Sequence, residues 1–213
     1  MALSHANEET SQAADAAWPL TLPSLTRRVP PSPTRGEGIS PHLALRRGTR
    51  AEHGRVDLLF SRFDLTLAPS YKRFLQAQAR AFLPVEDALE RVGADDLIAG
   101  WAAHRRADAL RADLHALGLD TPEPLPAPAL PTPAAFVGAW YVLEGSRLGG
   151  ALLARSVAPD LPRAFLTTRG PKWAKSVEML NNRLYDGAEL EGALRAARAV
   201  FALFESAALE LVE

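Results

Sequence analysis

The stretch Tyr141-Val-Leu-Glu-Gly-Ser-Arg-Leu-Gly-Gly-Ala-Leu-Leu-Ala154 has the apolar spacing of a helix, yet it carries three glycines, at positions 145, 149 and 150. Each glycine inside a helix costs about 1 kcal/mol relative to alanine, so this segment gives up roughly 3 kcal/mol of helix propensity. Gly145 and Gly149 are four residues apart and therefore share one helix face. The pattern predicts a helix with bare backbone on one face, against which another helix or a flat ligand lies.

The polar residues of the same segment bear on the choice between these two alternatives. Glu144 and Arg147 fall outside the apolar stripe, and Ser146 stands among the glycines. Close helix packing is the commoner reason for a single glycine pair, whereas three glycines with a serine among them favour a kink that faces a ligand. Both alternatives stay open on this segment alone.

His53 lies on a second predicted helix, in the segment Leu45-Arg-Arg-Gly-Thr-Arg-Ala-Glu-His-Gly-Arg-Val-Asp57, about ninety residues before the glycines. The same helix face carries Val56, Phe60 and, one turn on, Asp57. A metal-binding histidine usually donates its other ring N–H to an oxygen atom, and a carboxylate four residues on can accept that hydrogen bond. Taken alone, the pair is more often an ordinary surface hydrogen bond. Together with the glycine helix, it suggests a heme sandwiched between two helices.

Three arginines stand in the N-terminal part of this second helix. Arg46 and Arg50 fall on the side of His53, and Arg47 does not. Guanidinium groups there can pair with carboxylates at the edge of a ligand. The alternative interpretation is a solvated basic turn.

The spacing of apolar residues from Leu43 onward predicts an all-α, single-domain fold, because these residues recur at intervals of three and four and strand-like alternation is scarce. His104 and His115 belong to a helix that its composition predicts to be mostly solvated, which makes them weak ligand candidates. Helices are expected over residues 43–62, 69–92 with a break before Pro84, 95–117, 133–157, 171–184 and 188–212.

Composition bounds the class of protein. The 213 residues, 47% of them hydrophobic, suffice for one core. A formal net charge of −1 gives no overall electrostatic reason to expect nucleic-acid binding. The absence of cysteine excludes disulfides, thiolate metal sites, iron–sulfur ligation and cysteine catalysis. Without a signal peptide or a long apolar span, the sequence predicts a soluble cytoplasmic protein that does not bind membranes.

The first 41 residues are polar and proline-rich, and such a composition predicts a disordered N-terminal extension. A second interpretation, a translation start placed too far upstream, also stays open. Residues 42–213 are expected to form the folded domain.

The two segments quoted above resemble the bacterial heme oxygenases, particularly the type encoded with bacteriophytochromes, and the likeness runs from about Leu43 to the C-terminus. In that family a Leu-Arg-x-x-Thr-x-x-x-His motif supplies the proximal heme ligand. His53 matches that ligand, and Asp57 matches a carboxylate four residues after it. The resemblance implies a heme-oxygenase-like helical fold with heme between a proximal and a distal helix.

The resemblance also implies roles for other residues. Ser146 stands where the mammalian enzymes carry an aspartate that organises distal water, so the obvious side-chain anchor for water is missing, although bacterial members commonly have serine there. Residues 197–205 are similar to the last helix of the family, which closes one side of the pocket. The remaining matches are Arg46 and Arg50 with basic positions that meet the heme propionates, and Gly145, Gly149 and Gly150 with distal glycines that leave room for dioxygen.

The activity implied by the resemblance is oxidative cleavage of heme by dioxygen to biliverdin, carbon monoxide and ferrous iron. Heme would be both substrate and cofactor, with its iron ligated by His53. Electrons would come from a ferredoxin or a flavoprotein reductase, because no flavin or nicotinamide motif is present, and a bacteriophytochrome would accept the biliverdin. The alternatives are a non-catalytic heme or biliverdin carrier on the same fold and a cofactor-free helical interaction protein.

Overall fold

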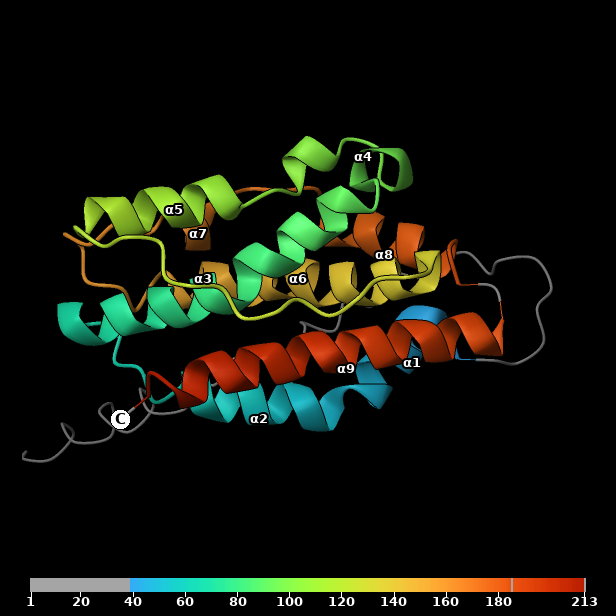
Figure 1. Ribbon diagram of the computed structural model, residues 1–213, viewed down its shortest axis with the longest axis horizontal. Coiled ribbons are helices and arrows are strands. Elements are labelled where there is room, and N and C mark those ends of the chain that lie inside the picture. The colour runs from blue at the N-terminus through green and yellow to red at the C-terminus, as the bar shows by residue number, and fades with distance from the viewer. Residues whose placement is uncertain (1–38, 185, 213) are drawn as a thin grey trace, which may run out of the picture.

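The computed structural model describes residues 39–184 and 186–212, and all regular structure in these ranges is helical (Figure 1). The all-α, single-domain prediction is confirmed. The elements are α1 (Pro41–Gly48), α2 (Arg50–Phe60), α3 (Ala68–Arg91), α4 (Ala94–Leu97), the 3-10 helix η1 (Trp101–Ala103), α5 (Ala107–Ala116), α6 (Pro133–Leu153), α7 (Ala164–Thr167), α8 (Trp173–Asn181) and α9 (Gly187–Leu209).

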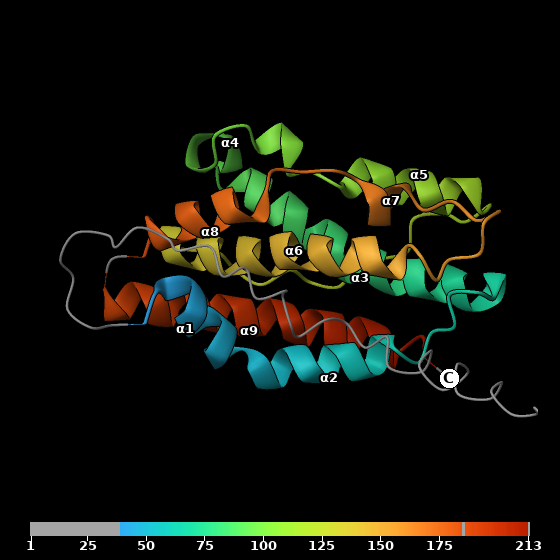
Figure 2. The same cartoon turned by 180° about the vertical axis from the view of Figure 1, so that it is seen from behind.

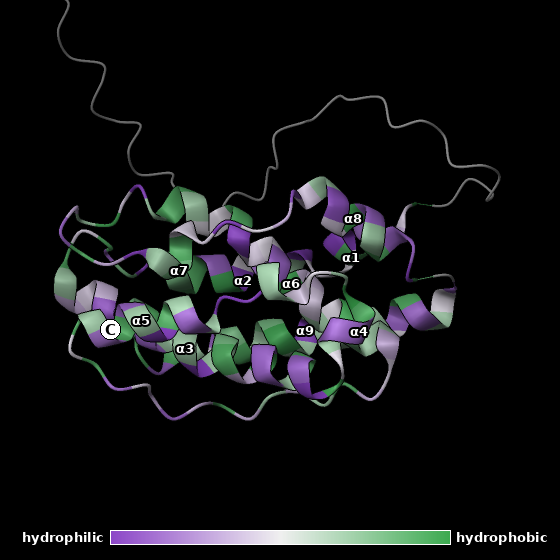
Figure 3. Ribbon diagram, turned by 90° about the horizontal axis from the view of Figure 1, so that it is seen from above, coloured by the Kyte–Doolittle hydropathy of each residue, from purple (hydrophilic) through white to green (hydrophobic). Residues whose placement is uncertain are grey.

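The helices form three layers, which Figures 1 and 2 show from opposite sides. Helices α1, α2 and α9 form one layer, α3, α6 and α8 the next, and α4 and α5 lie beyond them. In the view from above, each helix carries both hydrophobic and hydrophilic residues (Figure 3). This mixture is typical of helices that bury one face and expose the other. The longest helices, α3, α6 and α9, pack on one another and hold the largest buried side chains, among them Trp140 and Phe74.

Gly138 sets the distance between α6 and α9. A Cβ atom on Gly138 would lie 2.0 Å from the carbonyl oxygen of Ala193, far inside van der Waals contact. No larger side chain fits there unless the two helices separate. The helix that carries Gly145 therefore also contains a glycine, Gly138, that serves helix packing.

The predicted helix 43–62 is wrong in one respect, because it is two helices that meet at Thr49. The hydroxyl of Thr49 donates to the carbonyl oxygen of Leu45 at 2.8 Å, and its backbone torsions, φ −115° and ψ 9°, leave the helical range. A threonine bonded back to residue i−4 bends a helix. The bend changes the direction of the chain between Arg47 and Arg50.

The predicted break before Pro84 is also wrong, since α3 runs through it without interruption. Proline has no N–H, so the carbonyl of Arg80 loses its usual helical partner. That carbonyl instead accepts a hydrogen bond from the backbone N–H of Leu125, at 2.9 Å, in the proline-rich connection before α6. Burial of Pro84 and of its neighbours on both sides adds the packing energy that keeps the helix intact.

The single helix expected over 95–117 is three short elements, α4, η1 and α5. Gly93 and Gly100 take left-handed torsions, with φ of 88° and 74°, and such residues end helices. The short helix α7 was not predicted, and α6, α8 and α9 match their predicted ranges with differences only at their ends.

The predicted N-terminal extension, residues 1–41, lies outside the described residues except for its last three. Pro41 is the first residue of α1 and Ser40 is its N-cap, accepting a hydrogen bond from the N–H of Leu43. The folded part of the described chain thus begins one residue before the predicted boundary at 42. Among the described residues, no helix has the length and apolarity needed to span a membrane.

Candidate functional site

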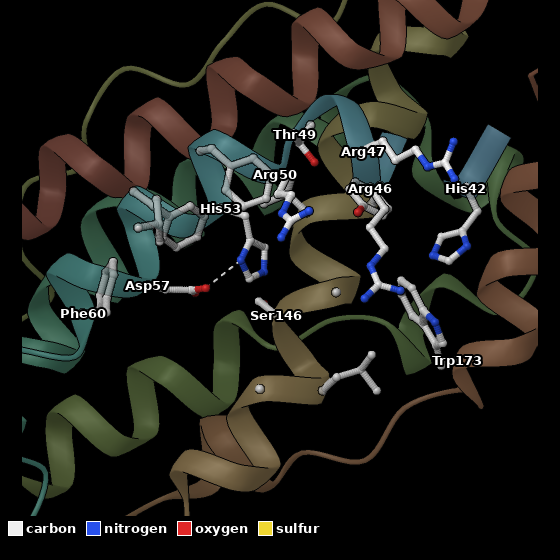
Figure 4. Close-up of a pocket in the computed structure, with 18 of the residues that line it drawn as sticks. His42, Arg46, Arg47, Thr49, Arg50, His53, Asp57, Phe60, Ser146 and Trp173 are labelled. Carbon is white, nitrogen blue, oxygen red and sulfur yellow. Dashed lines mark hydrogen bonds and ion pairs between the residues drawn. The ribbon is translucent and has the colours of Figure 1, made fainter. Parts of the chain in front are cut away.

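A cavity of about 620 Å³ lies between the layer of α1, α2 and α9 and the neighbouring helix α6 (Figure 4). This volume is within the range of small-molecule and cofactor pockets, roughly 300–1,000 Å³. The two sequence segments that carry His53 and Gly145 both line it, so residues about ninety positions apart face the same space. The cavity is the candidate functional site.

His53 reaches this cavity from α2, and Figure 4 shows its ring pointing toward α6. Its Nδ1 lies 2.8 Å from Oδ2 of Asp57, and its ring meets the ring of Phe201 edge-on at 5.5 Å between centroids. A carboxylate can only accept, so we assign the hydrogen to Nδ1. Nε2 then keeps the lone pair that a metal ligand needs.

Asp57 is nearly buried beneath His53, with 8% of its side chain exposed against 25% for the histidine. Burial raises the pKa of Asp57, and the hydrogen bond from His53 offsets only part of that rise. The carboxylate therefore holds the imidazole in one orientation at a cost in folding stability, a combination typical of residues kept for function.

The three arginines of the predicted helix 43–62, now on α1 and α2, all line the cavity: Arg46, Arg47 and Arg50. Arg46 extends toward Trp173, and Arg50 lies beside His53 (Figure 4). Arg47, which the sequence did not place on the side of His53, also lines this wall. The wall beside the imidazole is thus strongly basic and suits a ligand with carboxylates at one edge.

Three ring-bearing side chains meet at this basic end, and two of them, His42 and Trp173, are not singled out by any sequence pattern. The ring of His42 meets Trp173 edge-on at 5.6 Å and Tyr141 at 6.4 Å, and all three line the cavity. Burial, and then the charge of Arg46, lower the pKa of His42, so it is neutral at neutral pH. His42 stood at the predicted edge of the domain and Trp173 on a helix without recognised motifs, so no pattern drew attention to them.

The glycines of α6 separate into two groups. Gly145 and Gly149 line the cavity, and a Cβ atom on Gly145 would meet nothing within 4 Å. Gly150 is buried and does not line the cavity; a Cβ atom there would lie 3.3 Å from the carbonyl oxygen of Leu166 in α7. Both alternatives drawn from the sequence therefore apply: the first two glycines border open space, and the third allows close helix packing.

Ser146 lies between these glycines and also lines the cavity. Its Oγ donates to the carbonyl oxygen of Leu143 at 2.7 Å and accepts from Nη2 of Arg106 at 2.5 Å. Arg106 is 2% exposed, and its guanidinium lies over the rings of Phe82 and Phe165, 4.6 and 5.0 Å from their centroids. No sequence pattern singles out this arginine, because the composition around it predicts a mostly solvated helix face.

That interpretation is wrong for His104 as well, which is 4% exposed. Its Nδ1 lies 2.9 Å from Oε2 of Glu144, and Arg147 donates to the carbonyl oxygen of His104 at 2.7 Å. Burial opposes ionisation of Glu144, but the hydrogen bond from His104 and the charge of Arg147 prevail and lower its pKa. Glu144 and Arg147 thus turn away from the cavity into a buried ionic cluster, while His115 is exposed on α5.

Apolar side chains complete the site. Phe201 and Phe204 of α9 close one side, as expected for the last helix, and Val56 and Phe60 of α2 extend the wall beyond Asp57. The donor set fits heme on three counts: an oriented imidazole, arginines for carboxylates, and open space over bare backbone opposite.

Comparisons with known proteins bear on the identity of the site. No protein-family model matches the chain. The chain is 33% identical over 147 residues to a heme oxygenase of Xanthomonas campestris pv. campestris (strain 8004), an alignment that spans 65% of this chain and 88% of that protein. It also superposes on crystal structures of the NO- and CO-bound heme oxygenase of Neisseria meningitidis with a TM-score of 0.70 and 23% identity, over 82% of this chain and 93% of that one.

Proposed function

The chain belongs to the heme oxygenase family, and we propose that it cleaves heme oxidatively with dioxygen to biliverdin, carbon monoxide and ferrous iron. The observation that carries this proposal is the His53–Asp57 pair facing Gly145 across a cavity with a basic wall. When bound, heme supplies the iron and the macrocycle that is opened, so the protein contributes binding, orientation and placed hydrogen bonds.

On the α2 side, Nε2 of His53 would hold the heme iron, and Asp57 would orient the imidazole. The hydrogen bond to Asp57 fixes the tautomer and makes the imidazole a better donor. Arg46 and Arg50, joined by Arg47, would pair with the propionates and thereby fix the rotation of the ring. These assignments rest on the matching motif and on the shared cavity wall.

On the α6 side, Gly145 and Gly149 would leave the space that dioxygen and water need beside the ring. We propose no such role for Gly150, because it does not line the cavity and its lack of a side chain instead allows α7 to pack closely. The phenylalanines of α9 would exclude bulk water from the apolar end.

The reaction needs an external electron donor, and we propose a ferredoxin or a flavoprotein reductase. We further propose that a bacteriophytochrome accepts the biliverdin, a suggestion that rests on the sequence resemblance alone. Both partners can be tested by adding them to the reconstituted protein and following the rate of bilin formation and its transfer.

Hemin titration of two matched variants tests the site. In His53→Ala the ferric absorption spectrum of the wild-type complex should be lost, since the proposed ligand is gone. In His115→Ala, which removes an exposed histidine on α5, the spectrum and affinity should stay unchanged. A wild-type spectrum in His53→Ala would refute the ligand assignment, and tight hemin binding without bilin formation under reductant and air would favour a carrier.

A further inference from the structure

The hydroxyl of Ser146 has hydrogen-bond directions that its partners fix. Its Oγ lies 2.7 Å from the carbonyl oxygen of Leu143, and between these two groups only the hydroxyl can donate. It also lies 2.5 Å from Nη2 of Arg106, and there only the guanidinium can donate. The proton of the hydroxyl and one of its two lone pairs are therefore committed, which leaves one acceptor position.

Arg106 is held in place from several sides. Its guanidinium is enclosed by two phenylalanine rings, Nη2 also donates to the carbonyl oxygen of Leu143 at 2.6 Å, and its backbone N–H donates to Oε2 of Glu86 at 2.8 Å. Burial, and then the charge of Arg147, lower the pKa of Arg106 to about 9, so it remains a charged donor at neutral pH. The donor to Ser146 is thus a side chain that is fixed by several contacts and charged at neutral pH.

We propose that Arg106 is a positioning residue that makes Ser146 a hydrogen-bond acceptor toward the cavity, so that Ser146 orients a water molecule and does not itself give up a proton. The inference rests on the function proposed above. A water that donates one hydrogen to Ser146 has its second hydrogen available for the space over Gly145. Serine at this position is then an anchor for water after all, through an arginine that lies outside the recognised motifs.

A double-mutant cycle on the ferric heme complex tests this. The quantity measured is the pH midpoint of its acid–alkaline spectral transition, which needs heme binding but no turnover. Ser146→Ala and Arg106→Met should each shift the midpoint by about half to one pH unit, the size of a single hydrogen bond. The double variant should match Ser146→Ala, because Arg106 acts through Ser146.

Arg147→Met is the matched control, since Arg147 is a neighbouring buried arginine that bonds to His104 and Thr168 and makes no bond to Ser146. Any shift it causes should be the same with and without Ser146. Additive shifts for Arg106 and Ser146, or an unchanged midpoint in Ser146→Ala, would overturn the inference. If Arg106→Met does not fold, Arg106→Leu, which also removes the donor, takes its place in the cycle, and the Ser146→Ala midpoint still decides. Failure of the wild type to give a ferric heme spectrum would instead refute the proposed function.

Discussion

Asp57 has one carboxylate oxygen bonded to His53, while the other, Oδ1, is buried without a hydrogen-bond partner among the described residues. A buried, half-satisfied carboxylate destabilises a fold, and the raised pKa of Asp57 reflects that penalty. At the scale of single residues, the buried carboxylate of Asp57 therefore lowers the stability of the fold. Such residues are expected where binding or catalysis requires them.

The raised pKa of Asp57 predicts a pH-dependent effect of Asp57→Asn on the apo protein. A carboxyl group whose pKa is raised on folding contributes stability at low pH that is lost as pH rises through its folded pKa. Asparagine does not titrate, so the melting temperature of Asp57→Asn relative to wild type should rise between pH 4 and pH 8. The same variant should bind heme about 10-fold more weakly, because the imidazole loses its charged partner.

Asp120→Asn, at an exposed carboxylate, serves as the control and should show no such trend. Thermal unfolding of both variants at the two pH values measures the effect. A difference from wild type that is the same at pH 4 and pH 8 would contradict the account of Asp57.

At the scale of helices, α6 has two faces with opposite requirements. Gly138 allows α9 to approach on one part of the helix, and Gly145 leaves the cavity open on another. Both residues are glycines in a helix, so sequence alone gives them the same significance. The structure separates them by what an added methyl group would meet.

Substitution by alanine should therefore have opposite effects at these two positions. Gly138→Ala should destabilise the apo protein by about 3 kcal/mol, because its methyl group would press on the backbone of Ala193. Gly145→Ala should stabilise the apo protein by up to about 1 kcal/mol through helix propensity, yet slow bilin formation by crowding the cavity. Denaturant unfolding measures the first effect and single-turnover rates the second. Equal destabilisation by both substitutions would show that the two glycines have the same role.

The elements show how far sequence reasoning reached. Periodicity predicted the long helices, since each buries a continuous apolar face. Periodicity missed the bend at Thr49, which depends on the hydrogen bond from the Thr49 hydroxyl to the carbonyl oxygen of Leu45. The break expected at Pro84 does not occur, because the carbonyl oxygen of Arg80 accepts a hydrogen bond from Leu125 N–H, a contact between distant residues that no local pattern predicts. The motifs brought His53 and the glycines to one cavity, but Arg106 and His42 act through tertiary contacts, and no local pattern marks such contacts.

At the scale of the whole molecule, α1 is part of the core that the described residues form. Leu45 of α1 is fully buried, and the N–H of His42 donates to Oδ1 of Asn181 in α8 at 3.0 Å. The first helix is thus fixed by contacts within the described part of the chain. Its own N-cap, Ser40, also lies within that part.

Deletion of residues 2–38 is therefore predicted to leave the fold intact. The free energies of unfolding and of hemin binding should stay within about 0.5 kcal/mol of wild type, the range of changes remote from packed features. Deletion of residues 2–48, which also removes α1, is the contrasting variant and should abolish cooperative unfolding or hemin binding. A large loss in the shorter deletion would show that the N-terminal segment is part of the functional unit.

The most direct test of the central claim is a single turnover of the hemin complex with ascorbate under air, followed by absorbance and mass spectrometry. The account predicts that the heme spectrum disappears while biliverdin and carbon monoxide form in equal amounts, and that His53→Ala forms neither above the rate of free hemin. A wild-type complex that binds hemin stably but yields no biliverdin, or a His53→Ala variant that yields it at the wild-type rate, would contradict the account.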